Sequence, residues 1–421
     1  MINLFFALIL IVFIILSARK LLWGLGMIIV LLPSYLWRFN ILGLPTTFLE
    51  LMIVIIFLLW LIKEKRYKKI NFSFQKNNTN KVPQVLRILL GLWILASLLA
   101  LLTNFNWNTL GLWRAYFLEP LMFFLVFIYT VKDQKDWRVI INSLGLLLAW
   151  LFTVAMYQNF TDWNYIGAYN FPNVKRLTGP FTYPNALSLL TAPLAAFFFG
   201  LWLYSKDKLF NWHYLLLFVF GLSLAIMTVS QGAIVAIAFS LFLALILAKK
   251  IRKWTRVIFT LFLSGLFIVA TKINFNPNLN LESSSLDIRF NQWQETIRLL
   301  ADNFFLGTGL NGYQKALAYY HQNDWLEIYL YPHNIFLNFW TELGILGLII
   351  FIALIIYILY LLKKIFRAKN YLALALAMMW MVWLIHGLVD VPYFKNDLSV
   401  LFFIMLGLTF IVANNKKDVQ T

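Results

Sequence analysis

Apolar segments of about 20 residues recur along the whole chain, and they constrain its fold more than any other feature. A helix needs about 20 apolar residues to cross a bilayer, and this sequence supplies a dozen or so such segments. Of the 421 residues, 62% are hydrophobic and only 12% are charged, against roughly 25% charged residues in a soluble protein. The sequence therefore predicts an all-α polytopic membrane protein with about 12–13 transmembrane helices, forming a single integral membrane domain over residues 1–421. The predicted spans are 2–17, 21–37, 47–62, 86–103, 115–131, 139–157, 185–204, 213–229, 232–248, 257–272, 335–362, 371–389 and 398–413.

The basic residues indicate how these spans are oriented. Of the 35 lysines and arginines, 26 fall in one alternating set of connecting loops and 9 in the other. The richer set should lie in the cytoplasm by the positive-inside rule, so we expect a multi-pass protein of the cytoplasmic (inner) membrane with a cytoplasmic C-terminus. Thirteen spans place the N-terminus outside, whereas twelve spans place it inside. The same rule, together with attraction to anionic lipid headgroups, explains the formal charge of +18 without a nucleic-acid partner.

Several motifs of catalytic chemistry are missing from the sequence. The chain has no cysteine, which excludes disulfides, thiolate metal sites and thiol nucleophiles. It also has no glycine-rich phosphate loop with lysine, no HExxH and no Gly-x-Ser-x-Gly. We therefore expect neither nucleotide hydrolysis nor zinc chemistry, and no metal or other cofactor.

Only two polar intervals on the outer side are long enough to hold a reactive site: a short outer loop, 158–184, and a long outer (periplasmic or extracellular) loop, 273–333. In the short loop, Arg176 follows Lys175 and precedes a glycine–proline pair. A guanidinium offers a planar fork of donors that suits phosphate oxygens. An interfacial arginine bound to ordinary lipid phosphate explains the same position equally well.

The long outer loop contains a predicted amphipathic helix over 286–301. Apolar residues recur there every three or four positions, at Leu286, Phe290, Trp293, Ile297 and Leu300. Arg289 and Arg298 lie on the same segment, where a solvated or ion-paired helix face is the simpler explanation for them. The length of the loop favours a function, because long ordered loops commonly carry binding or catalytic residues.

Three further polar positions lie where outer segments meet apolar helices. His333 closes the long loop, and a neutral imidazole there can accept a proton from a hydroxyl group; a headgroup-level histidine without a role is the alternative. His386 and Asp390 lie near the outer end of the penultimate span, where ionisable groups are usually paired or functional. Pairing of Asp390 with Lys395 is at least as well supported as catalysis.

Two further positions are expected to be structural. Glu119 lies about one turn from the outer face, so we predict a buried pair with an arginine, and Arg114 introduces the same span. Ser230-Gln231-Gly232 forms a predicted tight outer turn, in which Gly232 should allow close packing of helices.

Four motifs, taken in order, resemble those of the O-antigen ligase and O-antigen polymerase family: RLTGPFTYPN, VSQGAIVA, RFNQWQETIRLLADNFFLGTGLNGY and HNIFLNFWTELGILG. The resemblance covers roughly residues 110–410. It implies a GT-C-like, multi-spanning glycosyltransferase of polysaccharide biosynthesis in the cell envelope. Such an enzyme moves a glycan from an undecaprenyl-diphosphate carrier to an acceptor hydroxyl on the outer face of the membrane, without a metal.

The resemblance also implies roles for particular residues. Arg176 and Arg289 correspond to the arginines that hold the diphosphate, and His333 corresponds to the histidine that assists the acceptor. Gln231 is a departure, because family members often have arginine there; Lys175 is a candidate to compensate for it. The expected substrate-binding residues are Lys175, Arg298, Asn334, Asn185, Gln231 and Tyr313.

Other functions and finer distinctions stay open on sequence grounds. A transporter or flippase for a lipid-linked or anionic solute predicts inverted repeats and ionisable residues near the membrane midplane, whereas the charged candidates here cluster at one face. A non-catalytic assembly or anchoring protein is a third hypothesis. Ligase and polymerase use the same kind of donor, so the sequence does not identify the acceptor, which is a glycan, a lipid or a protein.

Overall fold

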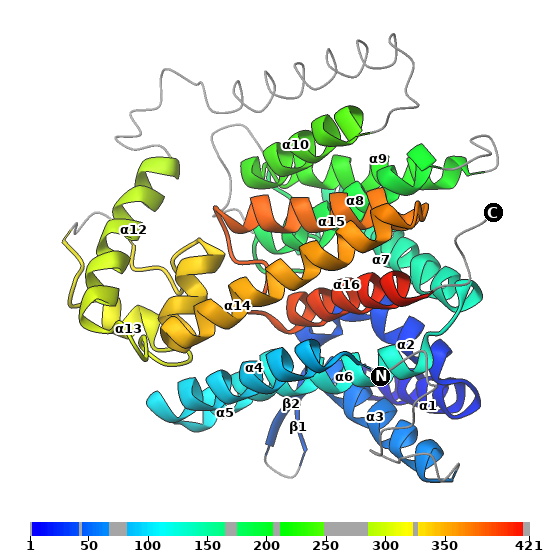
Figure 1. The fold of residues 1–421 in the computed structure, drawn as a ribbon, viewed down its shortest axis with the longest axis horizontal. Helices are drawn as coiled ribbons and strands as arrows, with labels where there is room; N and C mark the ends of the chain where they lie inside the picture. Colours follow the sequence, from blue (N-terminus) through cyan, green and yellow to red (C-terminus); the bar gives the residue numbers. More distant parts are fainter. Residues whose placement is uncertain are drawn as a thin grey trace.

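The computed structural model describes residues 2–41, 44–66, 82–164, 175–204, 211–247, 285–322 and 327–415. These residues form an all-α polytopic bundle with a single two-stranded hairpin among them, which confirms the predicted fold class. Figure 1 shows most helices running side by side, with α12 lying across one end of the bundle. The elements are α1 (Ile2–Arg19), α2 (Leu21–Val30), η1 (Leu32–Leu36), β1 (Arg38–Ile41), β2 (Leu44–Thr47), α3 (Phe48–Arg66), α4 (Gln84–Thr103), α5 (Trp107–Trp113), η2 (Arg114–Leu118), α6 (Glu119–Thr130), α7 (Gln134–Thr161), α8 (Pro184–Tyr204), α9 (Trp212–Met227), α10 (Gln231–Leu247), α12 (Ser285–Asp302), α13 (Tyr313–Leu317), α14 (Ile335–Arg367), α15 (Leu372–Gly387) and α16 (Asn396–Asn414).

The helices follow the predicted spans closely. Among the described residues, six helical stretches are long and apolar enough to cross a membrane, and five shorter apolar helices accompany them. Twelve of the predicted spans coincide with described helices; the span expected over 257–272 lies outside the described residues.

The predicted span over 21–37 is wrong at its C-terminal end. Helix α2 stops at Val30, and a short 3-10 turn, η1, follows with Pro33 near its start. Proline lacks the backbone N–H that an α-helix interior needs. Beyond it, the chain forms the antiparallel hairpin β1–β2, with Arg38 opposite Thr47.

Helices α8 and α16 form the centre of the bundle, because neighbouring helices bury nearly all of their surfaces. Small residues allow close approach around α8: a Cβ added at Gly200 would lie 2.5 Å from the Cα of Ala375, and one at Gly221 would lie 2.6 Å from the Cβ of Ala195. The first pair joins α8 to α15 and the second joins α9 to α8. Such contacts replace a hydrophobic driving force, which lipid does not supply between helices.

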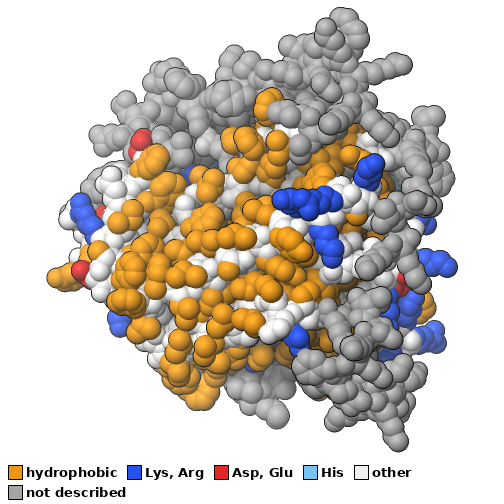
Figure 2. All heavy atoms as spheres, in the orientation of Figure 1, with side chains coloured by type: hydrophobic (Ala, Val, Ile, Leu, Met, Phe, Trp, Pro, Cys, Tyr) orange, Lys and Arg blue, Asp and Glu red, His pale blue; other side chains and the backbone are white. Residues whose placement is uncertain are grey.

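Helices α4 and α14 instead leave most of their surface uncovered. Figure 2 shows hydrophobic side chains over most of the face on which these two helices lie in Figure 1. On α4, exposed apolar residues recur every three or four positions and so form one stripe: Val85, Ile88, Leu92, Leu95, Leu99 and Leu102. A stripe of this kind is suited to lipid contact.

The amphipathic helix predicted over 286–301 is present as α12. Its buried face differs from the predicted apolar stripe, since Phe290 and Ile297 are exposed whereas Gln292, Glu295 and Thr296 are buried. The polar residues are buried because they bond to the segments that follow α12, including α13.

Candidate functional site

Three segments that are far apart in the sequence meet at the carboxylate of Asp390. Asn185, at the start of α8, donates from Nδ2 to Asp390 Oδ2 at 2.9 Å. His333, in the turn before α14, has its Nδ1 3.4 Å from Asp390 Oδ1. Arg176, in the short outer loop, donates to Asn185 Oδ1 at 3.2 Å. A guanidinium and an imidazole are therefore joined through one amide and one carboxylate.

Asp390 is buried, with 1% of its surface exposed, and it lies between α15 and α16. Burial by itself raises the pKa of this carboxyl group. The contact with His333, the charges of His333 and His386, and the Val391 amide lower the pKa, and together they outweigh the effect of burial. The net pKa lies below the ordinary aspartate range. Asp390 is therefore a carboxylate at neutral pH and an acceptor for its neighbours.

The backbone aims the side chain of His333 at this carboxylate. His333 has φ +47°, in the left-handed region, which costs an L-residue roughly 1–2 kcal/mol. The following residue, Asn334, caps α14 through Oδ1, which accepts from the amides of Phe336 and Leu337. Asn334 also donates from Nδ2 to the Leu388 carbonyl at 3.0 Å. The His-Asn pair thus starts α14 and ties it to the segment that holds Asp390.

Helix α12 holds the residues just before His333. Trp293 donates from Nε1 to the Pro332 carbonyl at 2.7 Å, and Gln292 donates from Nε2 to the Tyr331 carbonyl at 3.0 Å. The orientation of His333 consequently depends on a helix of the long outer loop.

Aromatic rings surround the imidazole. The ring centroids of Tyr329 and Tyr331 lie 5.1 Å and 4.7 Å from that of His333. Burial raises the pKa of the Tyr331 phenol and of the Tyr183 phenol. Both tyrosines are therefore neutral, and their hydroxyls can donate hydrogen bonds beside the site.

Arg289 lies on α12, the helix that contacts the residues just before His333. Its charge acts on Tyr329 and on His386, and His386 in turn is electrostatically coupled to Asp390. The structure thus brings the second predicted arginine within electrostatic range of the cluster around Asp390.

Arg176 is held against the end of α9. Its Nε donates to the Thr228 carbonyl at 2.9 Å, and the neighbouring Leu177 amide donates to the Met227 carbonyl at 3.0 Å. A guanidinium at a helix C-terminus satisfies carbonyls that the helix leaves unpaired.

A buried glutamine, Gln158, organises the loop that carries Arg176. Gln158 Oε1 accepts from the amides of Thr178 and Gly179 at 2.9 Å and 2.8 Å. Its Nε2 donates to Thr178 Oγ1 and to the Asn164 carbonyl, both at 2.9 Å. Asn164 in turn donates to the Gly179 carbonyl at 2.9 Å. One side chain of α7 therefore sets the path of this outer loop, including the left-handed turn at Gly179.

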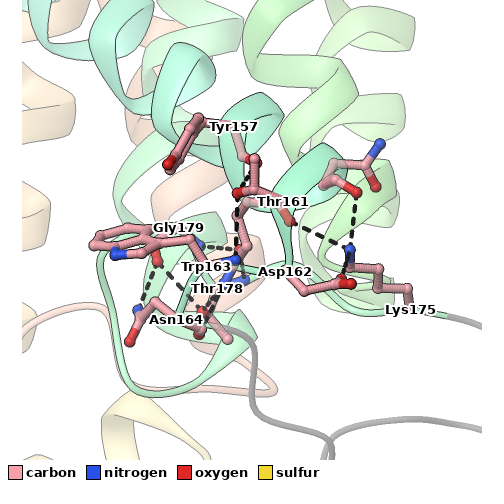
Figure 3. Close-up of polar contacts among 10 residues, drawn as sticks. Tyr157, Thr161, Asp162, Trp163, Asn164, Lys175, Thr178 and Gly179 are labelled. Atoms are coloured by element: carbon pink, nitrogen blue, oxygen red, sulfur yellow. Dashed lines mark hydrogen bonds and ion pairs between the residues drawn. The ribbon is translucent and has the colours of Figure 1, made fainter.

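Lys175 is engaged at the end of α7. Its Nζ donates to the carbonyls of Gln158 and Asn159, and it forms an ion pair with Asp162 (Figure 3). A lysine in this place neutralises the negative end of the helix dipole.

The remaining predicted binding residues lie at other places in the fold. Arg298 is exposed and donates to Gln322, and Tyr313 is fully buried, where its hydroxyl contacts Thr296 Oγ1 at 2.7 Å. Gln231 is the first residue of α10. Next to it, Gly232 does serve close packing, because a Cβ there would lie 3.0 Å from the ring of His386.

The pairing of Asp390 with Lys395, one of two alternatives left open by the sequence, is not found, and the predicted pairing of Glu119 is confirmed. Lys395 pairs with Asp397 at 3.6 Å, whereas Asp390 pairs with Asn185 and His333. Lys395 and Asp397 are only two residues apart, so a local contact competes with the expected one. Glu119 forms the predicted buried pair with Arg114 at 2.7 Å.

Sequence reasoning missed the central position of Asp390 and the contribution of Tyr183 and Tyr331. The only signal in the sequence was an ionisable residue near the end of a span. Its partners, Asn185 and His333, are 205 and 57 residues away, so no spacing rule connects them.

Comparison with known proteins points to the same part of the chain. No protein of curated function matches the sequence. The family model described as O-antigen ligase, Wzy_C, matches residues 216–352. This stretch begins within α9, includes both Arg289 and His333, and ends within α14. The match confirms the resemblance of this chain to the O-antigen ligase and polymerase family.

Proposed function

We propose that this protein transfers a glycan from an undecaprenyl-diphosphate carrier to an acceptor hydroxyl at the outer face of the cytoplasmic membrane. The family match supports transfer of this general type. The observation that carries the proposal is the contact chain from Arg176 through Asn185 and Asp390 to His333. It unites a group that can bind diphosphate with a group that can accept a proton.

His333 is the proposed general base. Because Nδ1 faces the Asp390 carboxylate, the neutral imidazole carries its proton on Nδ1, and Nε2 keeps a lone pair. The acceptor oxygen forms a bond to the sugar anomeric carbon while its proton passes to Nε2. Asp390 stabilises the imidazolium that results and keeps the ring oriented, as a carboxylate does for other histidine bases.

Arg176 and Arg289 are the proposed partners of the leaving group. The bond between the anomeric carbon and the diphosphate oxygen breaks, and the electron pair stays with the diphosphate. Fixed guanidinium groups stabilise the negative charge that develops on that oxygen, and they do so most effectively where water is excluded. Asn185 orients Arg176 through the contact at 3.2 Å.

The test is glycan transfer by purified protein in detergent with an undecaprenyl-diphosphate-linked glycan. We expect His333→Ala and Arg289→Ala to abolish transfer, because the first removes the base and the second removes charge from the leaving-group site. Binding of the lipid carrier should remain measurable in both variants. Lys315→Ala is the control, since this exposed lysine lies on α13 in the same outer segment. Unimpaired transfer in both of the first two variants would refute the mechanism.

The same assay distinguishes polymerase from ligase activity. A ladder of lengthening glycans indicates that the acceptor is another glycan unit, whereas a single addition to a lipid or protein acceptor indicates ligation.

A further inference from the structure

The turn that follows α12 exposes three consecutive apolar side chains. Phe304, Phe305 and Leu306 are 42%, 76% and 56% exposed. They lie in the middle of the long outer loop, which is otherwise mostly polar. Water is an unfavourable environment for such a group, and exposed apolar clusters mark interaction sites.

The backbone of this turn is held in place by two transmembrane helices. On the α14 side, the Thr308 amide donates to the Thr341 carbonyl at 2.7 Å, and the Ile345 amide donates to the Phe305 carbonyl at 3.3 Å. On the α4 side, the Leu310 amide donates to the Ala100 carbonyl at 3.1 Å. The three side chains are therefore displayed by a fixed scaffold.

The turn meets the ends of two lipid-facing stripes. Gly309 lies close to Thr103 and Asn104, since a Cβ added to it would be 2.9 Å and 3.0 Å from their Cβ atoms. These residues follow Leu102, the last residue of the exposed stripe on α4. The exposed stripe on α14 starts just after the kink at Gly344, with Leu346, Ile349, Ile352, Ile356 and Leu359. Figure 2 shows the apolar face that these helices share. The exposed turn is thus continuous with a surface that contacts acyl chains.

Both segments at this junction lack charge. Residues 303–312 and 99–113 contain no Asp, Glu, Lys, Arg or His. The second segment adds two exposed aromatic residues, Phe105 and Trp107. Aromatic residues without charged neighbours are typical of the boundary between headgroups and acyl chains.

We propose that the apolar turn, residues 304–306, inserts into the leaflet on the side of the candidate site and contacts lipid at the headgroup–acyl boundary. The long outer loop then touches the membrane at its midpoint as well as at its ends. This insertion anchors the C-terminal end of α12, the helix that carries Arg289 and holds His333 in position. The inference does not depend on the proposed glycan transfer.

The absence of cysteine in the native sequence allows a direct test. Phe305→Cys is labelled with a nitroxide, and the protein is reconstituted into vesicles of phosphatidylethanolamine and phosphatidylglycerol. Spin relaxation by oxygen, which concentrates in lipid, is compared with relaxation by a water-soluble nickel chelate. Leu95→Cys, in the middle of the α4 stripe, is the lipid reference, and Lys315→Cys is the water reference.

We expect oxygen to relax the label at position 305 more strongly than the nickel chelate does. The label at position 95 should behave in the same way, whereas nickel should relax the label at position 315 more strongly than oxygen does. Nickel access at 305 equal to that at 315 would overturn the proposal. Low access to both reagents would also overturn it, because a second copy or another protein would then cover the turn. Because the Phe305 side chain is 76% exposed, its replacement removes few contacts, and Leu306→Cys provides an independent second position.

Discussion

At Asp390, one buried carboxylate meets an amide and an imidazole that approach from different outer segments. Asp390 is buried and lies next to His333, the proposed base. We therefore expect it to affect the reaction through His333. Its low pKa keeps it ionised across the neutral range. Any loss of transfer between about pH 7 and pH 5 must therefore come from another group, because Asp390 protonates only below the ordinary aspartate range.

Asp390→Asn should separate charge from shape at this position. The amide has nearly the same size, but it cannot stabilise an imidazolium or fix the tautomer of His333. We expect the transfer rate to fall by about 10²-fold or more, while binding of the lipid carrier changes little. Rates and carrier affinities in detergent measure the two effects separately.

The control for this variant is Asp302→Asn, since Asp302 is exposed at the end of α12 and accepts a hydrogen bond from the Tyr320 hydroxyl, away from Asp390. It should transfer at the rate of the native protein. A rate for Asp390→Asn equal to that of the control would show that the carboxylate has no part in the reaction.

Among the single elements, helix α7 positions part of the site, because its residue Gln158 bonds to the loop that carries Arg176. Gln158 makes four hydrogen bonds to the outer loop that carries Arg176. Two of its partners are backbone amides of a tight turn, which have few alternatives because the region is buried. A helix side chain therefore controls the geometry of residues 175–183, the described part of the loop before α8, which form neither helix nor strand.

Gln158→Leu should destabilise this loop while leaving the Arg176 side chain itself unchanged. Each buried polar group that loses its partner costs about 1–3 kcal/mol, so we expect a loss of at least about 2 kcal/mol in stability. Hydrogen exchange should become faster over residues 175–184, and affinity for the lipid carrier should fall. Thermal unfolding in detergent and exchange mass spectrometry are the measurements.

Thr153→Val is the matched control on the same helix, because its exposed hydroxyl bonds only to the Ala149 carbonyl one turn away. It should leave both exchange and stability within about 0.5 kcal/mol of the native values. If Gln158→Leu behaved in the same way, the loop would not depend on this side chain.

At the scale of the whole molecule, the outer segment and the transmembrane bundle are joined at the kink in α14. Gly344 has φ +69° and ψ −176°, which interrupts the helix. The kink brings the backbone of α14 against that of residues 305–306. Beyond this junction, the same outer segment supplies Arg289 and His333, so its seating affects the whole site.

Gly344→Ala should disrupt this junction. A Cβ at this position would lie 2.1 Å from the Phe305 carbonyl oxygen, and a positive φ with ψ near 180° is a conformation that is essentially restricted to glycine and costs an L-residue about 1–3 kcal/mol. We expect a loss of stability above about 2 kcal/mol and weaker transfer. Both are measured on purified protein, by thermal unfolding and by the transfer assay.

Gly91→Ala in α4 is the corresponding control, since nothing lies within 4 Å of an added Cβ there. Alanine is favoured over glycine in a helix by about 0.5–1 kcal/mol, so this variant should be unchanged or slightly more stable. Equal stability of both alanine variants would mean that the junction tolerates a different backbone path.

The helical bundle, the positions of most spans and the helix over 286–301 could all be predicted from the sequence. These features follow from composition and periodicity within about 20 neighbouring residues, because lipid requires every spanning backbone to satisfy its own hydrogen bonds. Motif resemblance also selected Arg176, Arg289 and His333. Local rules failed where a proline ended α2 early and where the buried face of α12 proved to be polar.

Which of these residues contact one another depends instead on how the helices pack. Asp390 could have paired with nearby Lys395, yet it contacts Asn185 and His333, which are 205 and 57 residues away. Gln158 likewise bonds to a loop about twenty residues further along. Such contacts arise from how α7, α8, α14 and α15 pack against one another. Helix packing depends on many side chains at once, so no local pattern in the sequence records it.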